Sequence, residues 1–256
     1  MPKRFTQRRR GQIVSLLSAE GELSVDFLAG HFEISEVTIR KDLAELEANG
    51  LLLRRHGGAI PLPSELVSER SDSEAHQIKK GIAELAVTLI KDHNRIIIDS
   101  GNTTSEIIPL LQHKLGLVVM TNALDVANRL RELENEPTLL MTGGTWDARS
   151  ESFQGQLAEQ VLQQYDFDQL FIGADGIDVA RGTTTFNELF NLSRVMAEVA
   201  REVIVVAESN KVERKIHNLE LPWSMVDVLV TDGRIEQTVK HNIERQGVKV
   251  LTNELG

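Results

Sequence analysis

The feature that most constrains the fold of this chain is the regular alternation of apolar runs and helical patterns over residues 77–256. Strands that are apolar along their whole length are buried on both faces, and strands that alternate with helices run parallel. The pattern therefore predicts an α/β domain in which a Rossmann-like parallel sheet is covered by helices on both faces. The expected strands are 95–99, 117–121, 138–142, 169–173, 203–207, 226–231 and 248–251, and the expected helices lie near 79–92, 103–114, 123–134, 156–165, 187–200 and 237–246.

Polar residues and glycines follow several of these expected strands, where an open α/β sheet binds its ligands. Glycine lets the backbone approach a ligand closely, hydroxyl groups donate hydrogen bonds, and the N-terminus of a helix favours an anion. Each position alone has a plainer interpretation, as a helix cap, a turn or a solvated lysine. Because five strand ends converge on one edge, we expect a small anionic ligand there. The candidate residues are Asp99, Ser100, Gly101, Asn102, Thr103, Thr104, Thr121, Asn122, Gly143, Gly144, Asp175, Thr185, Glu188 and Lys211.

The first 60 residues carry a different pattern, that of a winged helix-turn-helix. Apolar residues at helical spacing predict a short helix around 13–17, a second after Ser24 and a third from Glu36 to Gly50. Ser35 is a good N-cap for the third helix because its hydroxyl accepts a hydrogen bond from a free backbone N–H. A short apolar run, two arginines and a Gly-Gly turn follow, as in a basic hairpin tip. An ordinary three-helix bundle with solvated charges is the plainer alternative.

Side chains on the front of the third helix and on the hairpin tip favour DNA binding over that alternative. The third helix would enter the major groove, and the hairpin would contact the DNA backbone or the minor groove. The first ten residues add five basic side chains and no acidic one. The candidate DNA-binding residues are Ser35, Glu36, Thr38, Arg40, Lys41, Arg54, Arg55 and His56.

The net charge of −10 is unevenly distributed, so it does not exclude a nucleic-acid partner. Residues 1–60 hold 9 basic and 8 acidic side chains, a net charge of +1, and the remainder holds 19 and 30, a net charge of −11. Attraction to phosphate acts over about 10 Å, so a local basic face is sufficient. The absence of cysteine excludes disulfides, a cysteine-ligated metal and a cysteine nucleophile.

Residues 61–76 are polar, contain two prolines near their start and show no sustained periodicity, which is typical of a linker. We therefore expect a DNA-binding domain at residues 1–60 and a ligand-binding domain at residues 77–256. No segment has the roughly 18 apolar residues of a membrane span. We expect a soluble cytoplasmic protein with no membrane partner, metal or cofactor.

These motifs resemble the DeoR family of bacterial sugar-operon repressors over essentially the whole chain. The N-terminal signature reads SEVTIRKDLAELEANGLLLRRHGGA, and the effector-domain signatures read IIIDSGNTT, VMTNAL, MTGGT, FIGADGID, TTFNE and VTD. Residues 150–203 resemble most the amino-sugar (GlmR-type) branch, which suggests glucosamine 6-phosphate as effector. The resemblance implies a repressor that binds operator DNA as a homodimer or homotetramer and that a phosphorylated sugar releases.

The C-terminal half also resembles ribose-5-phosphate isomerase, with SGNTT where that enzyme grips phosphate. Ile172 stands in place of a carboxylate of the enzyme, and the enzyme's glycine-rich loop reads Arg181-Gly182-Thr183-Thr184 here. An enediol isomerisation needs positioned acid and base groups, so the loss of one favours a binder. The repressors' usual Asp-x-Ser-Lys reads Glu208-Ser209-Asn210-Lys211. Two alternatives stay open: an isomerase-like enzyme with an appended DNA-binding module, and a sensor that acts through a protein partner.

Overall fold

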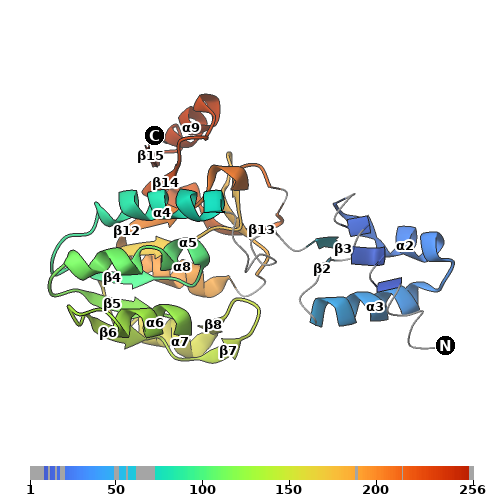
Figure 1. Ribbon diagram of the computed structural model, residues 1–256, viewed down its shortest axis with the longest axis horizontal. Coiled ribbons are helices and arrows are strands. Elements are labelled where there is room, and N and C mark those ends of the chain that lie inside the picture. Colours follow the sequence, from blue (N-terminus) through green and yellow to red (C-terminus); the bar gives the residue numbers. More distant parts are fainter. Residues whose placement is uncertain are drawn as a thin grey trace. The chain divides into compact units, whose positions relative to one another are not determined.

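A computed structural model describes residues 9–10, 12–14, 16–17, 21–48, 52–55, 57–61, 73–187, 190–214 and 216–253. The chain divides into two compact units, which we call the N-terminal unit (residues 1–71) and the C-terminal unit (residues 72–256) (Figure 1). The N-terminal unit has one hydrophobic core, and the C-terminal unit has two.

The N-terminal unit is a winged helix-turn-helix. Residues 9–10, 12–14 and 16–17 are helical, and Ile13, Val14, Leu16 and Leu17 contribute to its core. Ser24 caps α2 (Val25–Phe32) by accepting a hydrogen bond from the N–H of Phe27 at 3.0 Å, and Glu33 ends this helix in the left-handed conformation. The third helix, α3 (Glu36–Ala48), buries the apolar stripe that its spacing predicts: Ile39, Leu43 and Leu46.

A small antiparallel sheet completes this unit and forms the predicted wing. Its strands, in spatial order, are β1 (Leu23–Ser24), β3 (Gly58–Pro61) and β2 (Leu52–Arg55). Gly57, at the tip between β2 and β3, has a φ of 85°, a conformation that favours glycine. A side chain at Gly58 would meet the carbonyl oxygen of Leu23 at 2.4 Å. Glycine therefore lets β1, a strand that the sequence did not predict, approach the wing.

The C-terminal unit is built on a parallel sheet of seven strands, in the order β15-β14-β12-β9-β4-β5-β6. All seven predicted strands are confirmed. They are β4 (Arg95–Ile98), β5 (Val118–Thr121), β6 (Thr138–Met141), β9 (Phe167–Ile172), β12 (Ala200–Val206), β14 (Val228–Asp232) and β15 (Lys249–Asn253).

Helices cover both faces of this sheet, as expected. One core joins Ile96 and Ile98 to α4 (Ser73–Val87), the 3-10 helix η2 (Ile108–His113) and α6 (Leu124–Arg131). The other joins Ile97 to α7 (Gln156–Leu162), α8 (Asn191–Glu198) and α9 (Gln237–Glu244). The alternation of Ile96, Ile97 and Ile98 between the two cores follows from the two-residue period of a strand.

Two of the expected helices have other bounds in the structure. Helix α4 begins at Ser73, inside the expected linker, and residues 62–72 lie outside the described part of the chain. The single helix expected at 103–114 is instead α5 (Asn102–Ser105) followed by η2. Pro109 explains this break, because it has no N–H to donate to the preceding turn and is favoured at the start of a new helix, where it lies in η2.

Short strands outside the large sheet were not predicted. A hairpin of β7 (Thr145–Asp147) and β8 (Ser152–Gln154) follows β6, and β10 (Gly176–Asp178), β11 (Gly182–Thr185) and β13 (Asn218–Pro222) form a third sheet. Two further 3-10 turns are η3 (Ser209–Lys211) and η4 (Trp223–Met225). No helix in the described part of the chain combines the length and the apolar composition needed to cross a membrane.

Candidate functional site

The first two turns of α3 present the predicted polar side chains. The hydroxyl of Ser35 accepts a hydrogen bond from the N–H of Thr38 at 3.3 Å and lies 3.0 Å from the Thr38 hydroxyl. The exposed guanidinium of Arg40 lies 2.5 Å from the carboxylate of Glu36, and Lys41 is also exposed. These five side chains therefore occupy one end of α3, where a recognition helix contacts base edges.

Val37 lies among them and was missed by the sequence analysis. This residue is 73 % exposed. An exposed apolar side chain on such a surface can contact the methyl group of thymine. Its position off the buried stripe of α3 was the signal in the sequence, but an apolar side chain does not stand out as a DNA-binding residue.

The wing is attached to the far end of α3 through Arg54. Its guanidinium lies 2.7 Å from the carboxylate of Glu47, which also accepts a hydrogen bond from the Arg54 N–H at 3.0 Å. Arg55 is half-buried on β2, and His56 lies outside the described residues. Glu47 therefore fixes the wing relative to α3.

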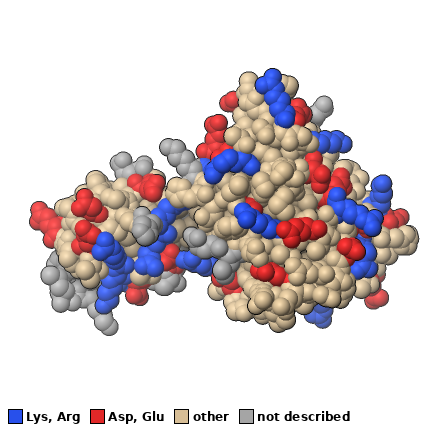
Figure 2. Space-filling view, turned by 180° about the vertical axis from the view of Figure 1, so that it is seen from behind, with Lys and Arg blue, Asp and Glu red and all other residues tan. Residues whose placement is uncertain are grey.

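Two arginines of the basic N-terminal segment have a structural role that the sequence analysis did not foresee. Arg9 and Arg10 contact the two carboxylate oxygens of Asp42 at 2.6 and 2.9 Å, and Asp42 is buried. They connect the first helical residues to α3. On the visible face of the C-terminal unit, basic and acidic side chains are interspersed (Figure 2), which gives DNA phosphates no continuous basic surface on that face.

In the C-terminal unit, a change of direction in the strand order lies between β4 and β9. The chain runs from β4 outward to β5 and β6, and then returns to β9 on the other side of β4. Such a reversal leaves a crevice at the carboxyl edge of the sheet, the edge where its strands end. Next to this point, Asn122 joins the ends of β5 and β4, because its amide donates to the Asp99 carboxylate at 2.8 Å and accepts from the Ser100 N–H at 3.2 Å. Burial raises the pKa of Asp99 to about 6.

The loop after β4 meets the turn after β12 at this edge. Gly101 has a φ of 143°, and the Thr104 hydroxyl donates to the carbonyl oxygens of Asp99 and Gly101 at 2.9 and 2.8 Å. The buried Thr103 hydroxyl donates to the Glu208 carboxylate at 3.4 Å. Asn102, the first residue of α5, is exposed beside them.

Glu208 also holds two lysines at this place. Its carboxylate lies 3.1 Å from the ammonium of Lys211 and 3.7 Å from that of Lys79 on α4. Burial favours the neutral acid, but Lys211 and then Lys79 hold the pKa of Glu208 below its usual range. The longer side chain of glutamate, where the family pattern has aspartate, still reaches Lys211.

A second polar network joins the end of β9 to the third sheet. Asp175 accepts hydrogen bonds from the Thr185 hydroxyl at 2.8 Å and from the Phe186 N–H at 3.1 Å. Glu220, on β13, accepts from the Ser193 hydroxyl at 2.8 Å. Burial raises the pKa of Glu220 to about 8, and the charges of Asp99 and Asp175 contribute. The sequence analysis missed Glu220 because no strand was expected there; its signal was a glutamate between two leucines.

Three other predicted ligand residues, Thr121, Gly143 and Gly144, have local structure typical of turns. The Thr121 hydroxyl accepts a hydrogen bond from the Ala123 N–H at 3.1 Å. Gly143 has a φ of 61°, and a Cβ at Gly144 would lie 2.6 Å from the carbonyl oxygen of Gln154. Glu188 lies outside the described residues.

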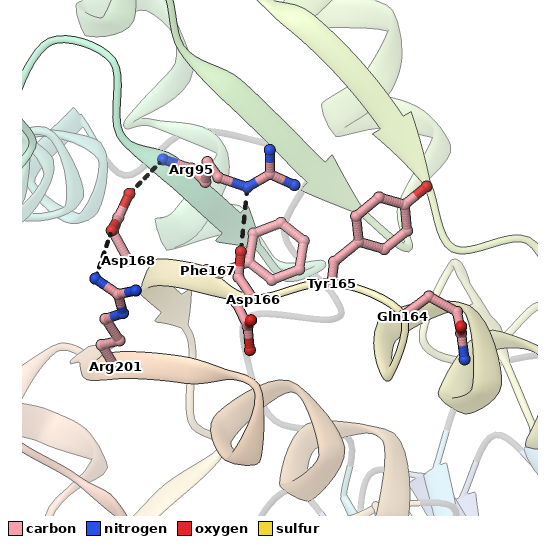
Figure 3. Close-up of a pocket in the computed structure, with 7 residues that line it drawn as sticks. All are labelled: Arg95, Gln164, Tyr165, Asp166, Phe167, Asp168 and Arg201. Carbon is pink, nitrogen blue, oxygen red and sulfur yellow. Dashed lines mark hydrogen bonds and ion pairs between the residues drawn. The ribbon is translucent and has the colours of Figure 1, made fainter.

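A pocket of about 300 Å³ opens at the opposite, amino edge of the sheet, beside the starts of β4, β9 and β12 (Figure 3). The Arg95 guanidinium lies 5.9 Å from the ring centre of Tyr165 and 5.8 Å from that of Phe167. None of the predicted ligand residues lines this pocket, which is formed by Arg95, Gln164, Tyr165, Asp166, Phe167, Asp168 and Arg201.

Comparison with known proteins shows which family this architecture represents. Residues 9–65 match the DeoR-like helix-turn-helix domain, and residues 74–233 match the DeoR C terminal sensor domain. The chain belongs to the DeoR family. It is 39 % identical over 252 residues to the "Putative aga operon transcriptional repressor" of Escherichia coli O157:H7, covering 96 % of this chain and 93 % of that protein. It is 33 % identical over 253 residues to the "Transcriptional repressor AccR" of Agrobacterium fabrum, covering 95 % and 97 %.

Membership of the DeoR family identifies the chain as a helix-turn-helix transcriptional repressor rather than an enzyme. The isomerase-like alternative finds no support among these relatives. Consistent with this, Ile172, which stands in place of a carboxylate of the isomerase, is buried in the apolar core behind β9.

Two solved structures resemble the chain distantly. Ribose 5-phosphate isomerase A of Methanocaldococcus jannaschii has a TM-score of 0.40 and 19 % identity, covering 54 % of each chain. The translation initiation factor eIF-2B of Pyrococcus horikoshii OT3 has a TM-score of 0.44 and 16 % identity, covering 88 % of this chain and 87 % of that one. At this distance the likeness carries no argument about the site.

Proposed function

We propose that this DeoR-family repressor binds the operator of a sugar or amino-sugar metabolism operon, and that a phosphorylated sugar at the carboxyl edge of the sheet releases it from DNA. The observation that carries the effector half is that the Thr103 hydroxyl and the Lys211 ammonium both contact the carboxylate of Glu208, beside the exposed Gly101-Asn102 loop. A hydroxyl donor, a cation and an open glycine backbone suit a phosphate group.

The DNA-binding half is supported by the position of polar side chains on α3 and the wing. Thr38, Arg40 and Lys41 would read the major groove, and Arg54, Arg55 and His56 would contact the backbone or the minor groove. The sensor that acts only through a protein partner is the alternative, and a DNA footprint distinguishes the two.

The sugar itself would lie against the carboxylates that follow β4 and β9. Asp99 and Asp175 accept hydrogen bonds, which the hydroxyl groups of a sugar or the ammonium of an amino sugar can donate. We propose an amino-sugar phosphate, with glucosamine 6-phosphate as the first candidate.

The experiment is a gel shift on the DNA upstream of the protein's own gene, with and without glucosamine 6-phosphate, other hexosamine phosphates and ribose 5-phosphate. We expect a specific shift that one of these sugars abolishes. A shift insensitive to all of them would contradict the effector proposal and leave the operator proposal standing. A chain that shifts no candidate promoter would contradict the operator proposal.

The operator-bound form is proposed to be a homodimer or homotetramer, because helix-turn-helix proteins match their symmetry to two half-sites. Sedimentation of the full chain, free and on operator DNA, tests this. A stable monomer in both states would contradict it.

A further inference from the structure

Lys79 is a lysine of α4 that belongs to none of the motifs of the sequence. Helix α4 is the first element of the C-terminal unit, and it begins 12 residues after β3 ends. Helix α4 leads into β4, which starts at the amino edge of the sheet. It therefore runs antiparallel to the strands, from the carboxyl edge toward the amino edge. Its buried side, with Ile78, Ile82 and Ala86, packs on the sheet in a hydrophobic core.

The polar side of α4 contacts the carboxyl edge at three places. Lys79 lies 3.7 Å from the carboxylate of Glu208, after β12. His76 lies 3.8 Å from the carboxylate of Glu106, after α5. Glu74 pairs with Arg234, after β14. Each partner belongs to a segment that follows the carboxyl end of a strand, so the start of α4 is attached to the edge where the effector is proposed to bind.

The contacts of Lys79 and Glu74 both lead to one short turn, which consists of Glu208 and the 3-10 helix η3 that follows it. Lys79 reaches this turn directly through Glu208. The other route passes through Arg234, whose N–H donates to the Asp232 carboxylate at 3.1 Å. Asp232 in turn accepts hydrogen bonds from the N–H and the hydroxyl of Ser209, at 2.7 and 2.9 Å.

The charges at this turn would change when an anion binds. Without ligand, the buried carboxylate of Glu208 has two cationic neighbours, Lys211 and Lys79, whose side chains are 9 % and 17 % exposed. A phosphate monoester brings a charge of about −1.5 to −2 at neutral pH. Placed beside Thr103 and Lys211, the phosphate would attract the same two lysines as Glu208. It would also repel the Glu208 carboxylate, and both effects are strong where water is excluded.

We propose that Lys79 is a positioning residue that couples effector binding to α4, through its exchange between Glu208 and the bound phosphate. This inference rests on the proposed function. A ligand shifts an equilibrium only when it interacts differently with the two states, and the Lys79–Glu208 contact is the element that would differ. Helix α4 follows the N-terminal unit directly in the sequence, so operator binding is the readout for a change at its start.

The test uses the full chain with three variants. Lys79→Gln removes the charge, Lys79→Arg keeps it, and Lys80→Gln is the matched control, because Lys80 is the next residue of α4 and pairs with Glu84 on the exposed side. The quantity measured is the ratio of operator affinities without and with a saturating sugar phosphate from the panel above, by fluorescence anisotropy. Calorimetry measures how each free variant binds the same sugar phosphate.

We expect Lys79→Gln to bind the sugar phosphate but to lower the affinity ratio by about fivefold or more, while Lys79→Arg and Lys80→Gln keep the wild-type ratio. A ratio within about twofold of wild type in Lys79→Gln would overturn the inference. Complete loss of sugar-phosphate binding in Lys79→Gln would also overturn it, since Lys79 would then be an ordinary ligand residue. A wild-type chain that ignores every sugar phosphate would instead contradict the proposed function itself.

Discussion

On α3 most candidate side chains are exposed and make contacts across the helix surface. At the carboxyl edge of the sheet several candidates, among them Thr103, Asn122 and Lys211, are buried and share hydrogen bonds or ion pairs. Arg40 and Glu36 form a surface pair, with 57 % and 46 % of their side chains exposed. Lys211 and Glu208 form a pair with 9 % and 6 % exposed. The first kind of pair contributes little to stability, and the second leaves an uncompensated buried charge when one partner is removed.

This difference teaches how each site would respond to mutation. A change on α3 should alter DNA binding and leave the fold intact. A change at the carboxyl edge should alter stability and ligand response together, because the same hydrogen bonds serve both.

The largest expected effect is that of Lys211→Met. Removing the ammonium leaves Glu208 buried with Lys79 as its remaining cation, so we expect a loss of about 3 kcal/mol of stability in the C-terminal unit. The response of operator binding to sugar phosphates should also disappear. Urea denaturation and the gel shift measure the two effects.

A double variant separates the two consequences. Lys211→Met combined with Glu208→Gln removes both charges, so most of the lost stability should return while the sugar-phosphate response stays absent. Wild-type stability and wild-type sugar-phosphate response in Lys211→Met alone would contradict the claim that the buried pair at the carboxyl edge serves both.

The next effect concerns pH and Glu220. Burial raises the pKa of Glu220 from its ordinary 4.5 to about 8, so the folded state holds a proton that the unfolded chain releases. Its contribution to stability is therefore present below pH 4.5 and is lost as the pH rises toward 8. Between these values the slope approaches about 1.4 kcal/mol per pH unit, or about 2 kcal/mol between pH 6 and pH 7.5.

Glu220→Gln removes this titration while it keeps the size of the side chain. We expect the variant to equal wild type in stability near pH 4.5 and to exceed it increasingly as the pH rises. Thermal unfolding in a pH series measures this, with Glu84→Gln as the matched control, because Glu84 is an exposed glutamate of α4. Parallel stability curves for wild type and Glu220→Gln would show that Glu220 is charged in the folded protein.

The same contrast explains what the sequence could predict. Periodic apolar residues fix the seven strands and the buried stripe of α3, because local period and burial are linked. The exposed front of α3 then follows by elimination. The contact between Thr103 and Glu208 joins residues 105 positions apart, and no local spacing encodes it.

Two kinds of feature could not be predicted from the sequence, and in both cases the reason is physical. Strands β10, β11 and β13 are short and antiparallel, and β11 is Gly-Thr-Thr-Thr, so no apolar run marks them. The position of Glu220 on β13 and the hydrogen bond between Thr185 on β11 and Asp175 could therefore not be predicted. Lys79 reads as an ordinary helical lysine until the fold brings it to the carboxyl edge of the sheet.

Arg40→Ala sharpens the comparison from the DNA-binding side. We expect it to lower operator affinity by about 1–3 kcal/mol if Arg40 contacts a base, with little change in stability because its pair with Glu36 is exposed. The matched control is Arg129→Ala on α6, where Arg129 pairs with Asp125 in the same i,i+4 geometry at 2.9 Å. Unchanged operator affinity in a gel-shift titration would remove Arg40 from the DNA-binding surface.

The smallest effect compares two serine caps within the N-terminal unit. Ser24 and Ser35 each accept a hydrogen bond from a backbone N–H three residues on, at 3.0 and 3.3 Å. Replacing either by alanine should lower stability by about 1 kcal/mol. Only Ser35 also holds the hydroxyl of Thr38, at 3.0 Å, so only Ser35→Ala should weaken operator binding under conditions where both variants are fully folded. Equal losses of affinity in the two variants would mean that helix stability, rather than the orientation of Thr38, limits DNA binding.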